Sequence, residues 1–439
     1  MPTTCRTGGG MEMKMKKYLR LGLVLMLAVN VAGCSNGKAA GVSKEPVSMV
    51  NKGSHFEVVL DYTAGTSHYD MGKAYGAAIL EAVPDYESLF DSYLADMTRD
   101  NQDLDFLLGR VKDIKPQMEQ DYVDEIEGIA SNFSGGTDSI RGDGKLSAEE
   151  LFLINLFPDV GRGTQCSAVS VYGQRSETRE TITARILDWY NGTKNQLSRM
   201  HAVVTYKNDD KSIVTIGYLG FMGTVSGFND DKVFGAILDA ATGAAYSSSS
   251  KYSYPMDLRY ALEHYQTMDE VAAYLTSPDR EYAFSHLIFM SDPSESKVLE
   301  NNVSGQANSL RNVRTEGSEF NGKIVWGISD SIGSVNSFLL KGNFNNHSLN
   351  LFNTARFESM KDALESKGEE VTVDELKSVA SYYGGEAPGE QTNGDLYNLG
   401  TQQIIIFEPG ELKLEVFFRP MDNVLPAVPQ FEEIDVDLD

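Results

Sequence analysis

The sequence predicts an α+β protein in which a run of helices is followed by a run of strands. From about Tyr69 to Leu156, apolar residues recur at helical spacing, and Pro84 ends the first helix. After Cys166 the pattern changes to short β-rich segments separated by turn residues. Helices and strands in separate runs indicate α+β layers and not a doubly wound parallel sheet.

Length and charge exclude some functions. The chain has 439 residues, enough for one large or two medium domains, and 41% hydrophobic with 23% charged residues is typical of a soluble globular protein. A net charge of -25 argues against binding to nucleic acid, which needs a basic surface. We therefore expect no nucleic-acid partner.

The first 34 residues resemble a bacterial lipoprotein signal. A basic segment at 11–20 precedes an apolar segment at 21–32 that is too short to cross a membrane comfortably, and small residues lead to Cys34. The pattern predicts that Cys34 is acylated, so that the protein is exported and anchored at the periplasmic or cell-surface face of a bacterial membrane. A plain secretory signal is the alternative. Residues 35–54 are small and polar and predict a flexible tether.

Residues 55–165 are expected to form a helical N-terminal segment that opens with a strand at 55–61. The expected helices share amphipathic spacing: 71–83, 86–97, 104–111 and 122–130.

Residues 143–150 resemble the second half of a calcium-binding EF loop. However, Arg141 would occupy a ligand position, and an arginine cannot bind a cation. We expect a helix capped by Ser147 instead, with Glu150 closing a capping box. No metal site is predicted.

Residues 166–420 are expected to form the β-rich segment. After the strands that begin at Cys166 and Thr181, we expect strands at 202–206, 212–217, 233–238, 286–290, 297–299, 323–328 and 337–340. Helices are expected at 256–275, 353–365 and 371–382, the last capped by Thr372. A hairpin is expected at 402–418, and residues 421–439 read as an acidic, frayed tail.

Cys166 is the candidate nucleophile. It would be the only thiol left after removal of the signal and acylation of Cys34, and it stands at the start of a strand. Arg185 and Asp188 lie on the next strand, on opposite faces unless a bulge turns one of them. The alternative is a buried cysteine that acts as a small hydrophobe, beside a half-buried salt pair.

Later segments complete a recognisable order of motifs: Cys166, Arg185-x-x-Asp188-Trp189, Gly227-x-Asn229, Asn336-Ser337-Phe338 and Arg356. In this order they resemble the cysteine N-terminal nucleophile (Ntn) hydrolases. The nearest branch is the penicillin acyltransferase-like amidases (acyl-coenzyme A:6-aminopenicillanic acid acyltransferase), related to acid ceramidase and the choloylglycine (bile-salt) hydrolases. The resemblance implies a four-layer αββα sandwich with the nucleophile at the start of a central strand. It also implies a precursor that is cut between Gln165 and Cys166.

The resemblance assigns a role to each candidate. Cys166 would be the nucleophile, Arg185 and Asp188 the arginine and aspartate of the site, Asn336 the oxyanion-hole asparagine, and Arg356 a late site arginine. Gly227 and Asn229 would form a loop near the substrate and the oxyanion.

The chain departs from the family pattern at two places. Ile186 follows Arg185 where the family usually has asparagine. Asp239 stands where bile-salt hydrolases carry a second asparagine, which puts bile-salt specificity in doubt. Asn343 is a rival to Asn336 as the oxyanion donor.

Chemistry explains why such a cysteine would have to become an N-terminus. A thiolate is a strong nucleophile, but no histidine lies in a motif beside it. A free α-amine has a pKa near 7.7–8.0 and can serve as the base. Asp188 would hold that amine, Arg185 would favour the thiolate, and Asn336 would donate to the oxyanion.

The sequence therefore predicts a hydrolase that cleaves linear amide bonds of small N-acylated molecules through an acyl-thioester, or transfers the acyl group to another amine. No cofactor is expected, and the two fragments would stay associated after cleavage. One alternative is a papain-like hydrolase that pairs an internal Cys166 with His201 or His286. The other is an inactive, surface-binding lipoprotein of the same fold.

Overall fold

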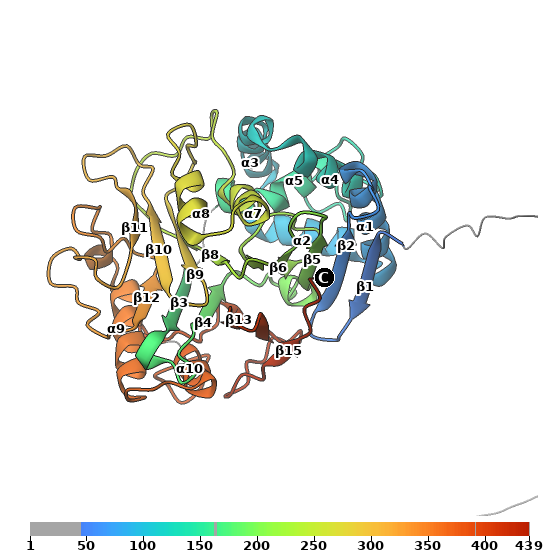
Figure 1. Cartoon of the computed structure of the whole chain (residues 1–439). Coiled ribbons are helices and arrows are strands. Elements are labelled where there is room, and N and C mark those ends of the chain that lie inside the picture. Colours follow the sequence, from blue (N-terminus) through green and yellow to red (C-terminus); the bar gives the residue numbers. More distant parts are fainter. Residues whose placement is uncertain (1–44, 162–164, 391, 439) are drawn as a thin grey trace, which may run out of the picture. The chain divides into compact units, whose positions relative to one another are not determined.

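The computed structural model describes residues 45–161, 165–390 and 392–438. Within these residues the chain is a mixed α+β protein with two sheets, as expected (Figure 1). No helix among them is long and apolar enough to cross a membrane. Cys34 and the expected signal lie outside the described residues.

The larger sheet has nine strands in the order β1-β2-β5-β6-β7-β8-β9-β10-β11. Only β2 and β5 run parallel; the other neighbours are antiparallel. The bounds are β1 (Val47–Asn51), β2 (Phe56–Asp61), β5 (His201–Lys207), β6 (Ile213–Tyr218), β7 (Ser226–Asn229), β8 (Phe234–Asp239), β9 (His286–Ser291), β10 (Ser296–Asn301) and β11 (Arg311–Arg314).

The smaller sheet is fully antiparallel and has the order β12-β3-β4-β13-β14-β15. Its strands are β3 (Gln165–Val171), β4 (Ile182–Asp188), β12 (Ser331–Val335), β13 (Thr401–Glu408), β14 (Lys413–Phe418) and β15 (Glu432–Ile434). The expected nucleophile is thus the second residue of a strand in the interior of this sheet.

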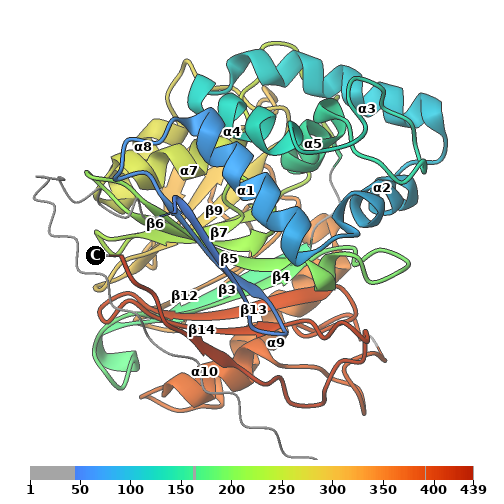
Figure 2. The same cartoon turned by 90° about the vertical axis from the view of Figure 1, so that its right-hand side faces the viewer.

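Helices cover the sheets on their outer sides, and the sheets face one another (Figure 2). The N-terminal helices are α1 (His68–Ala82), α2 (Tyr86–Met97), α3 (Asn101–Ile114), α4 (Gln120–Ala130), α5 (Ala148–Asn155) and α6 (Phe157–Val160). On the same side lie α7 (Tyr254–His264) and α8 (Met268–Leu275). Helices α9 (Leu351–Glu365) and α10 (Val373–Ala380) pack on the smaller sheet.

Apolar side chains fill the space between the two sheets. Phe228 of β7 stacks on Phe407 of β13 with ring centroids 4.3 Å apart, and Val214 and Val416 belong to the same cluster. These alternating apolar residues are what the strand pattern of the sequence predicted. The core therefore holds β3 and β4 firmly against the larger sheet.

The helix caps agree with the sequence. Ser147 and Glu150 form the capping box of α5, and Thr372 and Glu375 form that of α10. The expected single helix at 256–275 is wrong, because Thr267 and Glu270 form a further capping box that starts α8 separately.

Two expected strands are also wrong. Residues 323–328 and 337–340 form no strand, whereas β12 occupies 331–335. Trp326 explains this: its indole N–H donates to Ser331 and its ring covers Gly333, so the segment packs on a strand and is not one. Glycine and serine in β12 hid the true strand in the sequence.

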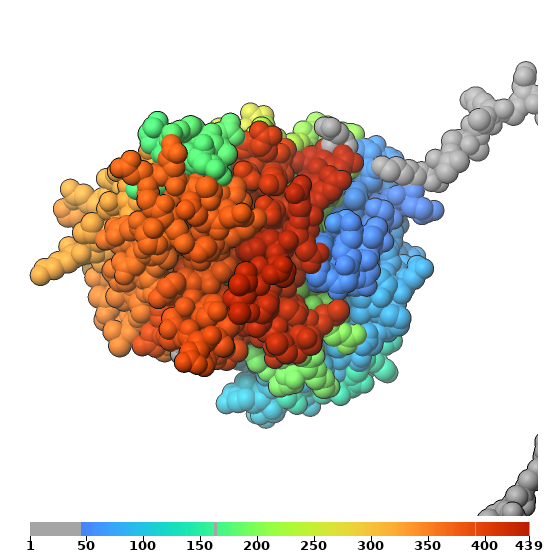
Figure 3. Space-filling view, turned by 90° about the horizontal axis from the view of Figure 1, so that it is seen from below, coloured from blue at the N-terminus to red at the C-terminus, as the bar shows by residue number. Residues whose placement is uncertain are grey.

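Both ends of the described chain are more ordered than expected. Strand β1 lies inside the expected tether and pairs with β2, so any tether ends before it. Strand β15 lies inside the expected frayed tail and pairs with β14. Figure 3 shows the red C-terminal residues beside the blue N-terminal strands, and there His55 Nδ1 and Glu432 Oε2 are 3.8 Å apart.

Candidate active site

Cys166 is buried, with 1% of its surface exposed, and pairs with Leu187 of β4. Its thiol faces Arg185, whose Nη2 lies 3.5 Å from Sγ and also donates to the carbonyl of Ile237 at 2.9 Å. Burial raises the pKa of the Cys166 thiol, and the guanidinium of Arg185 opposes that rise. Arg185 is therefore placed to favour a thiolate.

Asp188 lies on the opposite face of β4, as the strand pattern predicted. Its carboxylate accepts hydrogen bonds from Thr401 Oγ1 at 2.8 Å and Asn398 Nδ2 at 2.9 Å. Arg356 Nη1 is 3.9 Å away. Burial raises the pKa of Asp188, and the charge of Arg356 and these two hydrogen bonds oppose the rise.

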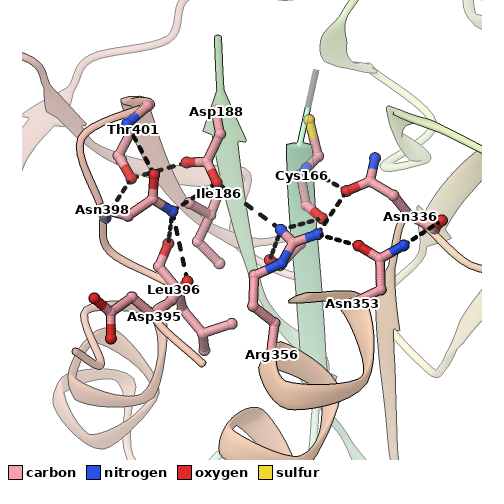
Figure 4. A network of polar contacts seen from close by, with 12 residues as sticks. Cys166, Ile186, Asp188, Asn336, Asn353, Arg356, Asp395, Leu396, Asn398 and Thr401 are labelled. Carbon is pink, nitrogen blue, oxygen red and sulfur yellow. Dashed lines mark hydrogen bonds and ion pairs between the residues drawn. The ribbon is translucent and has the colours of Figure 1, made fainter. Parts of the chain in front are cut away.

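Asn336 and Arg356 hold the backbone of Cys166 (Figure 4). The N–H of Cys166 donates to Asn336 Oδ1 at 2.6 Å, and Arg356 Nη1 donates to the Cys166 carbonyl at 3.2 Å. Arg356 Nη2 also donates to Asn336 Oδ1 at 2.9 Å, which fixes the orientation of that amide. Asn336 Nδ2 donates to the carbonyl of Asp239 at 2.8 Å.

This geometry brings together five of the residues named from the sequence: Cys166, Arg185, Asp188, Asn336 and Arg356. One expected detail differs. In this uncut chain the Cys166 nitrogen donates to Asn336, and the carboxylate of Asp188 is held by Asn398 and Thr401.

Asn343 lies elsewhere. Its Nδ2 donates to the buried carboxylate of Glu300 at 2.9 Å, and its Oδ1 accepts from Asn302 at 2.8 Å. These contacts secure the turn that follows Asn336 and leave Asn336 as the amide beside Cys166.

Gly227 and Asn229 also serve the scaffold. Asn229 Nδ2 donates to the carbonyls of Leu262 and Tyr265 at the end of α7, and its Oδ1 accepts from the backbone of Val233. A Cβ on Gly227 would lie 2.6 Å from the carbonyl oxygen of Val214. The glycine thus permits close strand packing, and the expected substrate loop is not built from these contacts.

The two histidines of the papain-like alternative are committed to other partners. His201 Nδ1 lies 3.1 Å from Gln403 Nε2, and burial lowers the pKa of His201 to about 3. His286 Nε2 lies 3.1 Å from Asn301 Nδ2, and its Nδ1 faces the carbonyl of Phe284. These contacts point both rings away from the role of a base for Cys166.

The sequence did not reveal three residues of this network. Asn353 accepts from Arg356 Nη2 at 2.8 Å and donates to the carbonyl of Asn336 at 2.8 Å. Asn398 and Thr401 hold Asp188 from a turn 210 or more positions away along the chain. No local motif marks them, because asparagine and threonine are common in turns.

Two cavities adjoin the site. One is apolar and lies next to Leu187, the strand partner of Cys166, with Trp189 and Tyr218 in its wall. The other has about 440 Å³ and is lined by polar groups that include Gln165, Asp239, Asn336 and Asn353. No group of three or more histidine, cysteine, aspartate or glutamate side chains in the described residues could hold a metal ion.

No family model matches the chain. No curated protein sequence matches it either. Among solved structures, the chain is similar to a Caenorhabditis elegans N-acylethanolamine-hydrolyzing acid amidase ortholog, at 15% identity and a TM-score of 0.41, over 56% of this chain and 93% of that one. It is also similar to penicillin V acylase from Agrobacterium tumefaciens, at 13% identity and a TM-score of 0.37, over 62% of this chain and 86% of that one. A third is a mutant of conjugated bile acid hydrolase from Clostridium perfringens, at 13% identity and a TM-score of 0.36, over 62% and 97% of the two chains.

Proposed function

We propose that the chain is a cysteine Ntn amidase with the αββα architecture, in which self-cleavage before Cys166 creates the catalytic amine. One observation carries the proposal. The polar side chains around Cys166 converge on its backbone nitrogen and carbonyl, through Asn336 and Arg356, while its thiol faces Arg185. A site built to hold the backbone of its nucleophile suits a terminal amine that acts as the base.

The first reaction is cleavage of the precursor. The Cys166 sulfur attacks the carbonyl carbon of Gln165, the carbon–nitrogen bond breaks, and the Cys166 nitrogen takes up the proton lost by the thiol. Water then hydrolyses the thioester, leaving a carboxylate on Gln165 and a free amine on Cys166. That amine keeps its contact with Asn336 Oδ1, where the amide N–H now donates.

The second reaction is hydrolysis of the substrate amide. The free amine accepts the thiol proton, the sulfur attacks the amide carbonyl, and the departing amine takes the proton. Asn336 Nδ2 donates to the tetrahedral oxyanion, an interaction worth about 10²–10³ in rate. Water then releases the acid from the acyl-thioester; another amine in its place gives acyl transfer.

The cavities support a small N-acylated substrate. The apolar cavity beside Leu187 suits the acyl group, and the polar cavity beside Asn336 suits the amine. Fragments 55–165 and 166–420 would stay associated after cleavage, because β2 from the first pairs with β5 from the second. We also propose that Cys34 carries the lipid that anchors the enzyme at the membrane.

The test is the intact mass of the purified protein together with N-terminal sequencing. We expect two associated chains, one of which begins at Cys166. Cys166→Ala should remain a single inactive chain, and Cys166→Ser should be cut slowly, because a hydroxyl is the poorer nucleophile. An active protein with Cys166 inside an uncut chain would refute the proposal and favour the papain-like scheme.

A further inference from the structure

The apolar cavity beside the nucleophile contains one polar group that has no partner. Its wall includes Leu187, which pairs with Cys166 across β3 and β4, so the cavity begins one strand away from the thiol. Most of its lining is aliphatic or aromatic carbon, from α2, α5, α6, β4 and β6. The side chains that bear polar atoms in this lining are Tyr93, Trp189 and Tyr218.

Two of these three groups are satisfied within the protein. The indole N–H of Trp189 donates to the hydroxyl of Tyr93 at 2.8 Å, and that hydroxyl donates to the carbonyl of Tyr190 at 3.0 Å. The Tyr218 hydroxyl is buried, yet no hydrogen-bond partner for it exists among the described residues. Only 9% of the Tyr218 surface is exposed. Buried polar groups without a partner are uncommon, and one that faces a cavity indicates a missing ligand atom.

The Tyr218 hydroxyl is a donor. Burial raises its pKa well above the usual value for tyrosine, so the group is neutral and keeps its proton at physiological pH. It is also close enough to Arg185 and Cys166 for their charges to act on it. A hydroxyl in this position would meet the part of an acyl group that lies just beyond the thioester carbonyl.

We propose that Tyr218 determines specificity by donating a hydrogen bond to an oxygen atom within the acyl chain of the substrate. The proposal rests on the proposed function, because it takes the cavity as the acyl site. The substrate class is an amide whose short, otherwise apolar acyl group carries an ether, hydroxyl or oxo oxygen. An unsubstituted alkyl chain would leave the Tyr218 hydroxyl without a partner.

The size of the cavity limits the length of the chain. It offers about 50 Å³, and a water-sized group needs about 10–15 Å³. The cavity therefore holds about four non-hydrogen atoms beyond the carbonyl carbon. Pentanoyl amides, and their analogues in which one methylene is replaced by an ether oxygen, match this length.

An oxygen scan tests the proposal. Fluorogenic aminocoumarin amides of pentanoic acid, 3-methoxypropanoic acid and ethoxyacetic acid share one chain length and differ only in the place of the oxygen. We expect the processed enzyme to prefer one ether isomer over pentanoyl by about tenfold in kcat/KM, the size of one buried hydrogen bond. Tyr218→Phe should abolish this preference and leave hydrolysis of the pentanoyl amide within about twofold.

Tyr206→Phe is the matched control. Tyr206 lies on β5 of the same sheet and also has a buried hydroxyl without a partner in the described chain, but it does not line this cavity. Its ring packs on the guanidinium of Arg259, 4.2 Å from the centroid. This variant should keep the preference for the ether isomer.

A binding measurement separates this proposal from the proposed function. The free acids of the same three compounds are titrated into the processed protein by calorimetry, which needs no catalysis. Binding that favours one ether acid, and loses that preference in Tyr218→Phe, supports the proposal even if no amide is hydrolysed. Amide hydrolysis without any effect of the oxygen overturns the role of Tyr218 and leaves the amidase in place. An equal loss on all three amides in Tyr218→Phe also overturns it, because the hydroxyl would then contact the shared reaction centre.

Discussion

Replacing Asn336 by alanine removes the one side chain that contacts both the Cys166 nitrogen and Arg356. Three hydrogen bonds are lost: from Cys166 N–H at 2.6 Å, from Arg356 Nη2 at 2.9 Å, and to the Asp239 carbonyl at 2.8 Å. The lost oxyanion donor alone should lower kcat by about 10²–10³, or roughly 2.7–4 kcal/mol. Arg356 keeps Asn353 and the Cys166 carbonyl as partners, so the fold should survive.

Asn343→Ala is the matched control for this substitution. Asn343 is also a buried asparagine of the same turn region, but its amide serves Glu300 and Asn302. Its loss should lower the free energy of unfolding by about 1–3 kcal/mol and leave kcat close to that of the wild type.

The assay for the pair measures the fraction of cut chain by intact mass, amide turnover per cut chain, and stability by urea unfolding. Full turnover in Asn336→Ala, with the loss in Asn343→Ala instead, would show that the oxyanion asparagine has been misassigned. Equal losses of turnover in both variants would show that the turn matters only as a scaffold.

Two further predictions concern proton transfer. Thr401→Val removes the 2.8 Å hydrogen bond to Asp188, which raises the pKa of that carboxyl further above its usual range and should move the acid limb of the kcat/KM profile to higher pH; Thr401→Ser should restore the profile, and an unmoved limb would deny Thr401 this role. Because burial raises the pKa of the Cys166 thiol, the rate of self-cleavage of freshly refolded precursor should climb about tenfold per pH unit from pH 6 until that pKa is reached; a flat rate in a gel time course would exclude attack by a free thiolate.

The sequence was informative where a local pattern determines the geometry. The hairpin of β3 and β4 places Ala168 opposite Arg185 and Cys166 opposite Leu187, and alternation along β4 then puts Arg185 and Asp188 on opposite faces. The capping boxes at Ser147 and Thr372 were equally readable, because each depends on residues only three positions apart.

The sequence was uninformative where long-range packing decides. The Gly227-x-Asn229 motif has the expected letters, yet Asn229 caps the end of α7, since tertiary contacts and not spacing choose the partner of an amide. Residues 323–328 have a strand composition, but Trp326 needs a surface to cover and finds it on Gly333. Such choices depend on residues that the local pattern does not contain.

The candidate site is assembled by the last third of the chain. Asn336 and Arg356 hold the backbone of Cys166, and Asn398 and Thr401 hold the carboxylate of Asp188. Before these segments fold, Asp188 would have no partner to offset the cost of burying its carboxylate, and the Cys166 nitrogen would lack its acceptor. The geometry for self-cleavage therefore cannot form until the chain has folded through β13. A lone cysteine at residue 166 can in this way stay inert during synthesis and export and gain its reactivity only in the completed fold.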